Sequence, residues 1–481
     1  MSLLRESSVY VASSCVVNAG AFLLIPVLTR ILSPAEYGIL GGIGVFAALL
    51  SIVMPLGLHG AVARFYYDYR ERHGELRCYV STIVMTVLAV NVILVAALML
   101  AGPVVFAMLL PRQNFPFFPY GAVVLITGLF TVLGLVPLTL FRVRKQPGRY
   151  ALAEIGRFVV ASTVTLYLVI VLKQGVLGRL AGDLVAGGLV GLALVLSLLA
   201  TGDLAWRFDV EKVRASLAFG LPLIPHLLLQ FLIGMVDRLV IGRFRSLEDL
   251  GVFTVAASLA SVMNVVVMSV NSAAGPWLFN VASTLSDSRR LIAQTATKYV
   301  AALGVVCLCG VLFSREIVMV LLPPTYRSVW ALVPILIVGY FFQGLYYFLA
   351  NVLFYAKTTG RLVVISGIAA VIAVAGNLLL VPSFGVYGAA AAFLISNVCY
   401  CALTFGSVRR VYRVDYEFGR VAVLVGIIAL ALCNVFIEQP TAHALFGAAF
   451  IVGVGVAGLG AAVGRTWFSG PSIAPMRGGR D

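Results

Sequence analysis

Long apolar segments recur along the whole chain, and polar stretches of about a dozen residues or fewer separate them. A helix of roughly 18 to 20 apolar residues can cross the roughly 30 Å hydrocarbon core of a membrane. The segments therefore predict an all-α, polytopic membrane protein with about fourteen transmembrane helices and no separate soluble domain. The predicted helices span residues 9–29, 38–60, 79–101, 119–141, 150–172, 183–201, 215–236, 250–272, 297–314, 331–355, 362–381, 386–406, 420–437 and 442–463.

The composition agrees with a membrane protein. Apolar residues make up 61% of the chain and charged residues only 11%, too few charges to cover a soluble protein of 481 residues. The formal net charge is +15, but the basic residues stand singly or in small clusters between apolar runs, as in the loops of membrane proteins. We therefore expect no nucleic-acid partner. The seven cysteines lie in or beside apolar segments, away from His and acidic residues, so we expect no metal site and no cofactor.

The distribution of Lys and Arg orients the predicted helices. With the N-terminus in the cytoplasm, 24 of the 34 Lys and Arg residues fall in inner segments, 9 fall in outer segments, and Arg157 lies within a helix. Positive residues favour the cytoplasmic side of a membrane. The bias therefore predicts an even number of helices with both chain ends in the cytoplasm. The outer loop after the seventh helix departs from the rule, because it carries Arg238, Arg243 and Arg245.

Two short motifs each occur twice along the chain. R-x-x-S-x-x-[E/D]-[Y/L]-G occurs at residues 30–38 and 243–251, and K-x-x-G-R occurs at 145–149 and 357–361. The offset between copies is nearly the same for both motifs, which gives each copy six helices and the same orientation. The repeat predicts two six-helix lobes related by a pseudo-two-fold axis along the membrane normal, an architecture of transporters. The expected units are a first lobe at 1–206, a second lobe at 207–414, an added helix pair at 415–468 and a cytoplasmic tail at 469–481.

The sequence also resembles a known family around these motifs. IPVLTRILSPAEYGIL at 25–40 and PLGLHGAVARFY at 55–66 resemble the ends of the first two helices of polysaccharide exporters in the MOP flippase superfamily. FGLPLIP at 219–225 and VDRLVIGRF at 236–244 are similar to their seventh helix. The resemblance implies a transporter rather than an enzyme. Its relatives include O-antigen flippases and lipid II flippases, and in the latter the last two helices form a groove for the lipid tail.

The resemblance also implies a cargo and a location. The expected activity is flipping of undecaprenyl-diphosphate-linked oligosaccharide from the inner to the outer leaflet of the bacterial inner membrane. The product would serve the synthesis of surface polysaccharides such as the O-antigen of lipopolysaccharide. The expected partners are this lipid-linked oligosaccharide, the membrane lipids, and a polysaccharide polymerase and glycosyltransferases.

Arginines are the expected ligands of the cargo diphosphate, because guanidinium groups pair bidentately with phosphate oxygens. Arg30 and Arg243 hold equivalent positions in the two copies of the repeat. Arg238 lies at the end of the seventh helix, and Arg64 lies at the inner end of the second. The alternative for each is an anchor that reaches the headgroup phosphates of the membrane.

Other polar residues fall within the predicted helices. Glu154 and Arg157 are three residues apart on one helical face, which indicates an ion pair or a coupling site, and Asp237 beside Arg238 is interpreted in the same way. The remaining polar residues are expected either to line a glycan cavity or to form hydrogen bonds between helices. These residues are Asn18, His59, His226, Gln230, Asn264 and Asn271.

Two other functions stay open at this stage. A MATE-type cation-coupled multidrug exporter shares the superfamily, but it would need acidic residues deep in the helices, and the first predicted helix has none. A membrane glycosyltransferase or polymerase would carry catalytic groups on a long outer loop, and no predicted outer loop exceeds about 20 residues. The sequence contains no P-loop, so ATP hydrolysis within this chain is not expected to drive transport.

Overall fold

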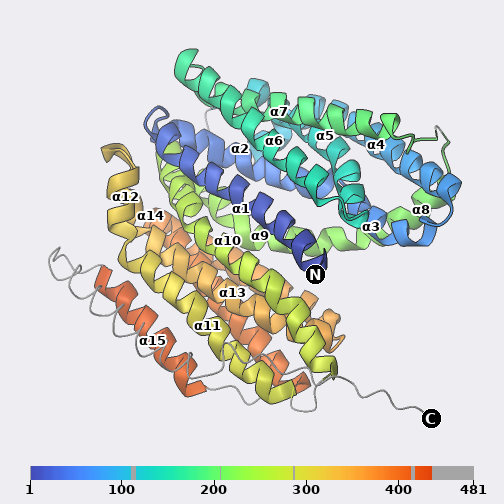
Figure 1. The fold of residues 1–481 in the computed structure, drawn as a ribbon. Helices are drawn as coiled ribbons and strands as arrows, with labels where there is room; N and C mark the ends of the chain where they lie inside the picture. The colour runs from blue at the N-terminus through green and yellow to red at the C-terminus, as the bar shows by residue number, and fades with distance from the viewer. Residues whose placement is uncertain (1, 110–114, 206, 285–287, 413–417, 436–481) are drawn as a thin grey trace, which may run out of the picture.

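The computed structural model describes residues 2–109, 115–205, 207–284, 288–412 and 418–435. Every regular element in these ranges is a helix (Figure 1). The helix predicted at 442–463 and the tail expected at 469–481 lie outside the described residues.

The helices form two bundles that lie side by side (Figure 1). The first half of the chain contains α1 Ser2–Thr29, α2 Pro34–Val53, α3 Leu58–Tyr69, α4 His73–Leu109, α5 Phe117–Val143, α6 Pro147–Leu166 with a π-helical turn Tyr167–Val171, and α7 Gly175–Ala200. The second half contains α8 Val210–Gly220, a 3-10 turn Leu221–Leu223, α9 Ile224–Phe244, α10 Leu247–Thr284, α11 Ser288–Leu312, α12 Ser314–Leu321, a 3-10 turn Pro324–Ala331, α13 Val333–Tyr355, α14 Thr359–Val411 and α15 Phe418–Val435. In Figure 1, α2 and α4 to α7 lie in one bundle and α10, α11 and α13 to α15 lie in the other, with α1 and α9 between them.

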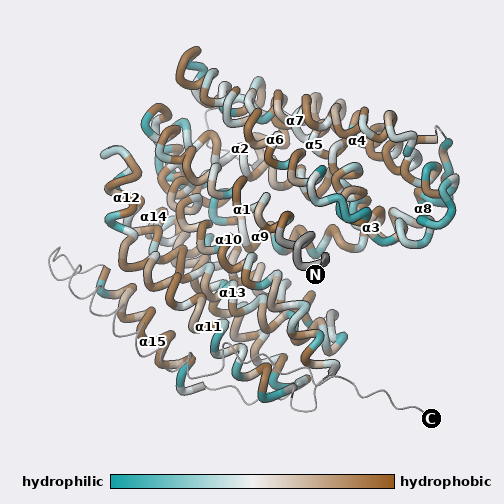
Figure 2. The backbone as a smooth tube through the Cα atoms, viewed as in Figure 1, coloured by the Kyte–Doolittle hydropathy of each residue, from teal (hydrophilic) through white to brown (hydrophobic). Residues whose placement is uncertain are grey.

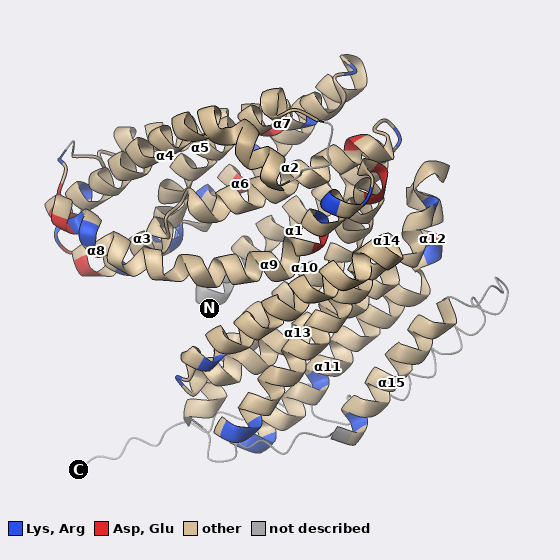
Figure 3. Cartoon of the chain, turned by 180° about the vertical axis from the view of Figure 1, so that it is seen from behind, with Lys and Arg blue, Asp and Glu red and all other residues tan. Residues whose placement is uncertain are grey.

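Eleven helical segments are long and apolar enough to cross a membrane. The longest, Gly360–Val411, is broken at Gly385, where φ is 60°, so it supplies two passes and the described chain has twelve. Hydrophobic residues run along the middle of the helices (Figure 2), and charged residues gather near their ends (Figure 3). The predicted all-α architecture of two six-helix lobes is confirmed, and α15 follows them where a thirteenth helix was predicted.

The observed helices extend beyond the predicted spans, because polar flanking residues that hydropathy excludes continue the helical backbone. Several charged residues expected in outer loops are therefore helical: Arg179 lies in α7, and Arg238 and Arg243 lie in α9. We call the end of the molecule formed by the turns at 30–33, 172–174 and 245–246 the Arg30 end. The opposite end, with the turns at 144–146, 201–205 and 356–358, is the Arg144 end.

The K-x-x-G-R motif forms the same helix-ending turn in both lobes. Lys145 and Lys357 have φ values of 54° and 56°, in the left-handed region that commonly terminates a helix. The amide of the next residue donates to a carbonyl five positions back, over 2.8 Å for Gln146 and 3.1 Å for Thr358. The repeat read from the sequence is therefore present in the backbone geometry.

The longer motif begins the second helix of each lobe. Ser33 caps α2: its hydroxyl accepts a hydrogen bond from the Glu36 amide at 3.3 Å, and the Glu36 carboxylate accepts one from the Ser33 amide at 2.8 Å. Ser246 caps α10 in the same way, accepting from the Asp249 amide at 3.1 Å. The serine thus satisfies a backbone donor at the helix N-terminus in both copies, and the acid places a negative charge where the helix dipole favours it. In the first copy the acid also accepts from the serine amide.

A third pair of equivalent turns lies at the Arg30 end. Lys173, between α6 and α7, has φ of 53°, and Gly385, at the equivalent position of the second lobe, has φ of 60°. The break at Gly385 frees carbonyls of α14, and the guanidinium of Arg245 donates to those of Val381 at 3.2 Å and Pro382 at 3.0 Å. Arg245, one of the exceptions to the charge rule, therefore has a structural partner.

Candidate functional site

The two lobes meet along α2 and α10, and their closest approach is at the Arg30 end. A Cβ atom at Gly38 would lie 1.9 Å from the carbonyl oxygen of Leu247, and one at Gly251 would lie 1.8 Å from that of Pro34. Only glycine permits such an approach, because any Cβ would overlap the facing backbone. We call this contact the lobe seam.

A second close contact joins α3 to the start of the seventh helix, toward the Arg144 end. Gly57 has φ of 69°, and a Cβ there would lie 2.5 Å from the carbonyl oxygen of Gly220. A Cβ at Gly220 would lie 2.6 Å from the carbonyl oxygen of Leu56. The segment that ends at this contact, α8, also packs against α3 and α4 of the first lobe. Because α1 also contacts α10, the helices at the lobe boundary are those of the first, second, seventh and eighth passes.

Arg30 and Arg243 are equivalent and both are exposed beside the lobe seam. Arg30 directly follows α1, and Arg243 lies in the last turn of α9. Within the described part of the chain, neither side chain forms an ion pair or a hydrogen bond. The shared serine and acid of the motif lie at a helix N-terminus, the Tyr or Leu is buried, and the glycine forms the lobe seam. Only the arginine of each copy has no such structural role among the described residues.

Arg238 is paired, unlike these two arginines. Its Nη1 lies 3.0 Å from Oδ1 of Asp237, and the two side chains are only 13% and 5% exposed. The guanidinium also lies over the Phe253 ring of α10, 5.6 Å from its centroid. The ion pair that the sequence suggested for Asp237 is therefore present. It neutralises one of the four cations expected to bind diphosphate.

Arg64 lies at the Arg144 end and is also paired. Its Nη1 is 2.8 Å from Oδ1 of Asp68, one helical turn later in α3, and both side chains are exposed. An exposed pair of this kind is weak, so the guanidinium stays accessible to a competing anion.

Several of the polar residues expected in a glycan cavity bond to neighbouring protein groups. Gln230 donates to the buried hydroxyl of Tyr400 at 3.1 Å, and Asn351 donates to Asn271 at 2.9 Å. Asn18, an exposed residue of α1, donates to a carbonyl of its own helix at 2.7 Å. For Gln230 and Asn271 the geometry is that of hydrogen bonds between helices.

The other three expected cavity residues differ from these. His59 is exposed. Nδ1 of His226 and Oδ1 of Asn264 are buried, and neither finds a hydrogen-bond partner among the described residues. Buried polar atoms without hydrogen-bond partners are rare. Of the six residues expected in a glycan cavity, His226 and Asn264 are therefore the two whose buried atoms call for a hydrogen bond from a ligand or water.

A chamber of about 510 Å³ lies inside the first lobe, between α2, α5, α6 and α7. Its wall includes Arg157, Arg179 and Asp183. Arg179 pairs with Asp183, with 2.6 Å between Nη1 and Oδ1. No ion pair joins Glu154 to Arg157 where the chain is described, so that predicted pair is not formed. We call this cavity the first-lobe chamber. Hydropathy alone does not predict it, because the apolar pattern puts Arg179 in a loop rather than in α7, where it pairs with Asp183 one turn later.

A second cavity, of about 310 Å³, lies between α11, α13, α14 and α15. Its wall is almost entirely apolar and includes Val300, Phe348, Phe405 and Val421. We call it the α15 groove. It contains no charged lining residue among those described, so it suits a hydrocarbon chain rather than a polar ligand.

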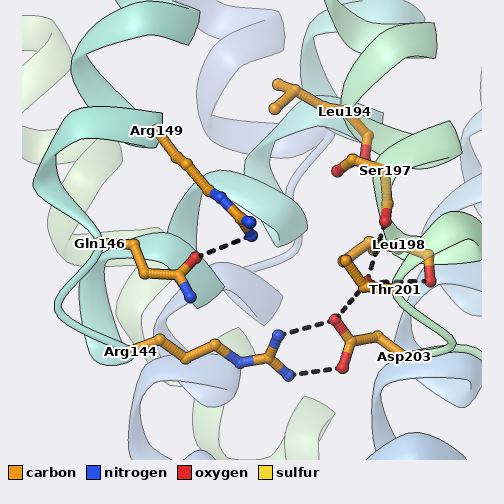
Figure 4. Close-up of polar contacts among 8 residues, drawn as sticks. All are labelled: Arg144, Gln146, Arg149, Leu194, Ser197, Leu198, Thr201 and Asp203. Atoms are coloured by element: carbon orange, nitrogen blue, oxygen red, sulfur yellow. Dashed lines mark hydrogen bonds and ion pairs between the residues drawn. The ribbon is translucent and has the colours of Figure 1, made fainter.

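An ion pair fastens two turns together at the Arg144 end (Figure 4). Arg144 donates two hydrogen bonds of 2.7 Å to the carboxylate of Asp203, and Thr201 donates a third. Burial alone would raise the pKa of the Asp203 carboxyl, but the hydrogen bonds from Arg144 and Thr201 outweigh burial and lower this pKa below its ordinary value. The hydrogen bonds to Asp203 raise the pKa of Arg144 in turn. This cluster is structural and holds the turn after α5 against the turn after α7.

Comparison with known sequences identifies the family. The family model described as polysaccharide biosynthesis protein matches residues 3–282, more than half of the chain. Two proteins of Haemophilus influenzae are 24% identical to the chain. The Lsg locus putative protein 1 matches over 304 residues, 62% of this chain and 70% of that protein. An uncharacterized membrane protein matches over 284 residues, 58% of this chain and 66%, just under two thirds, of that protein.

Comparison with solved structures identifies the fold. The lipid II flippase MurJ in an inward closed conformation superposes with a TM-score of 0.72 at 12% identity, covering 94% of this chain and 99% of that one. A multidrug resistance MATE family transporter of the MOP superfamily, inward-facing, superposes with a TM-score of 0.67 at 15% identity, covering 85% and 96%. The protein therefore has the fold shared by MurJ and MATE transporters, and it belongs to the polysaccharide biosynthesis protein family.

Proposed function

We propose that this protein is a flippase for undecaprenyl-diphosphate-linked oligosaccharide. It moves this lipid from the inner to the outer leaflet of the bacterial cytoplasmic membrane, where surface polysaccharide such as O-antigen is assembled. Both chain ends lie in the cytoplasm, so the Arg30 end faces outward. A polysaccharide polymerase and glycosyltransferases act beside it on the same lipid-linked saccharide.

The family match and the fold support this proposal together. The matched family is that of polysaccharide biosynthesis proteins, and one structure with the same fold is the lipid II flippase MurJ. A cargo of this class has a diphosphate, a polar glycan and a long apolar tail, and a carrier needs a group that suits each part.

The observation that carries the proposal is the pair of free arginines at the lobe seam. Arg30 and Arg243 are equivalent, exposed and without a protein partner in the described structure. Two guanidinium groups on opposite lobes suit a diphosphate, since each phosphate can take one bidentate contact. In this proposal the arginines bind the diphosphate near the outward end of its path, and Arg64 meets it near the inward end.

The α15 groove supplies a place for the tail. Its apolar wall and its position beside α15 suit a polyprenyl chain, which would otherwise stay in the surrounding lipid. The cargo would then be held by cations at its diphosphate and by apolar contacts along its tail.

The MATE fold makes cation-coupled drug export the second candidate. The span Val9–Thr29 of α1 has no acidic residue, and the buried acid of α9, Asp237, already pairs with Arg238. These features favour the flippase. Loss of drug resistance on gene deletion, with lipid-linked oligosaccharide unchanged, would favour the exporter.

The direct test is deletion of the gene in a strain that makes surface polysaccharide. We expect lipid-linked oligosaccharide to accumulate on the cytoplasmic leaflet, out of reach of a membrane-impermeant glycan label applied from outside. Restoration of labelling by the wild-type gene is the control. An unchanged leaflet distribution after deletion would contradict the proposal.

A further inference from the structure

The first-lobe chamber lies away from the lobe seam and from the arginines assigned to the diphosphate. Its walls come from α2, α5, α6 and α7, which lie side by side in the first lobe (Figure 1). At about 510 Å³ it falls within the range of cavities that hold small ligands. Its wall is mostly apolar, with a few polar groups, as in most ligand sites.

The charges on the chamber wall do not balance. Asp183 is neutralised by Arg179 at 2.6 Å, which leaves the guanidinium of Arg157 as the second cation of the wall. Arg157 has no ion-pair or hydrogen-bond partner in the part of the chain that the structure describes. Glu154, one turn away on α6, neither pairs with Arg157 nor lines the chamber. The wall therefore carries one net positive charge.

The positive charge of Arg157 lies within a membrane-spanning segment. Arg157 is an exposed side chain near the middle of the span Pro147–Val171. An unpaired cation at such a position in a membrane span is unfavourable and usually marks a substrate or ion pathway. A guanidinium in this position is best satisfied by a carboxylate, which it can bind through two parallel hydrogen bonds. The described part of the protein supplies no such carboxylate, and a ligand that carries one would complete the pair.

Hydroxyl groups line the same chamber. Ser51 and Thr127 donate their protons to carbonyls of their own helices at 2.7 and 2.8 Å, which leaves their oxygens as acceptors. The hydroxyl of Thr131 makes no hydrogen bond among the described residues and can donate or accept. Acceptors and a donor beside a cation match a ligand that has both hydroxyls and a carboxylate.

We propose that the first-lobe chamber binds an acidic sugar residue, with Arg157 holding its carboxylate and Ser51, Thr127 and Thr131 meeting its hydroxyls. The inference rests on the proposed function, because it assigns an acidic sugar to the glycan that is carried. The cargo class would then be lipid-linked oligosaccharides that contain a sugar carboxylate, and the chamber would select for them.

Binding to the purified protein tests the chemistry without any transport. The full chain in lipid nanodiscs is titrated by calorimetry with glucuronate, with glucose as the hydroxyl-only probe and with acetate as the carboxylate-only probe. We expect glucuronate to bind at least roughly tenfold tighter than either, because only it satisfies both the cation and the hydroxyls. Equal affinity for acetate or for glucose, or no binding of glucuronate, would overturn the proposal.

Variants locate the binding in the chamber. Arg157→Gln should weaken glucuronate binding by roughly tenfold or more, and Arg157→Lys should retain part of it. Gly44→Leu should block binding by filling the chamber, because Gly44 lines it and a Cβ there meets nothing within 4 Å. The matched control is Gly156→Leu on α6, which also meets nothing within 4 Å but lies outside the lining. Binding that survives both Arg157→Gln and Gly44→Leu would refute the site.

Failure of the acidic-sugar site and failure of the flippase assignment give different experimental results. If deletion of the gene leaves the leaflet distribution unchanged while glucuronate still binds through Arg157, the flippase assignment fails and the sugar-acid site stands. If deletion blocks flipping but glucuronate does not bind, the flippase stands and the acidic-sugar inference fails.

Discussion

Gly38 and Gly251 meet across the lobe seam through reciprocal contacts, each lying against the backbone carbonyl at the start of the other's helix. The two glycines hold the same position in the two copies of the sequence motif that contains them. The facing carbonyls, of Pro34 and Leu247, are equivalent to each other in the same way. The pseudo-two-fold axis therefore passes through this contact, and the glycine of the motif is explained by the close packing of α2 on α10.

Gly251→Val should open the lobe seam. A Cβ there would overlap the carbonyl oxygen of Pro34 at 1.8 Å, so α2 and α10 must separate. The separation of the helices is measured with Thr254→Cys in a protein whose seven native cysteines are replaced. The side chain of Thr254 lies against Gly41 of α2, so it is covered while the seam is closed. We expect a membrane-impermeant maleimide to label it slowly in the parent and much faster in the valine variant.

The control for this experiment is Gly234→Val in α9, where a Cβ meets nothing within 4 Å. This variant should leave the labelling rate of the cysteine unchanged. Equal labelling of the parent and the Gly251→Val protein would show that the seam does not hold the lobes together.

The Asp237–Arg238 pair should be strongly coupled. Asp237→Asn leaves a cation that is only 13% exposed without its counter-charge, and loss of one member of a buried pair costs about 3–5 kcal/mol. The double variant Asp237→Asn with Arg238→Gln should recover part of this loss, since no unpaired charge remains. Thermal unfolding in detergent measures both. A double variant no more stable than Asp237→Asn alone would argue against the pairing.

The Arg144–Asp203 ion pair should make stability depend on acid pH. The pKa of Asp203 is lowered in the folded protein, so its contribution is fully present above the unfolded pKa of about 3.9 and is lost as pH falls through the lower, folded value. Asp203→Asn should cost about 1–3 kcal/mol near neutral pH. The difference from wild type should shrink below about pH 4. Melting curves between neutral and strongly acidic pH measure it, and a gap of unchanged size at the acid end would point to another cause.

The sequence predicted the membrane-crossing helices and the equivalence of the two lobes well, because each prediction rests on a local sequence pattern. Hydropathy places a helix wherever an apolar run is long enough, and the nearly equal offsets of the two motifs relate turns with matching backbone geometry. Lys145 and Lys357 share a left-handed φ that the motif alone did not reveal. Hydropathy cannot place helix ends, since polar flanking residues continue a helix as readily as they leave it.

The partners of the charged residues were harder to predict, because they depend on which face of each helix is buried. Arg245 bonds carbonyls of α14 that are free only because the helix breaks at Gly385. The spacing of Glu154 and Arg157 suggested a pair that does not form, whereas Arg179 and Asp183 do pair. The spacing of two charged residues along one helix allows an ion pair, but packing against the neighbouring helices decides whether the pair forms.

The most direct test of the central claim is the rate of flipping by arginine variants. A strain that lacks the gene is complemented with wild type, Arg30→Ala, Arg243→Ala or Arg327→Ala, and outward-exposed lipid-linked oligosaccharide is measured with the impermeant label. Arg327, exposed in the turn Pro324–Ala331, is the control outside the motif. We expect Arg30→Ala and Arg243→Ala to lower exposure by roughly tenfold or more at equal protein levels, and Arg327→Ala to match wild type. Full exposure in both motif variants would contradict diphosphate binding at the lobe seam.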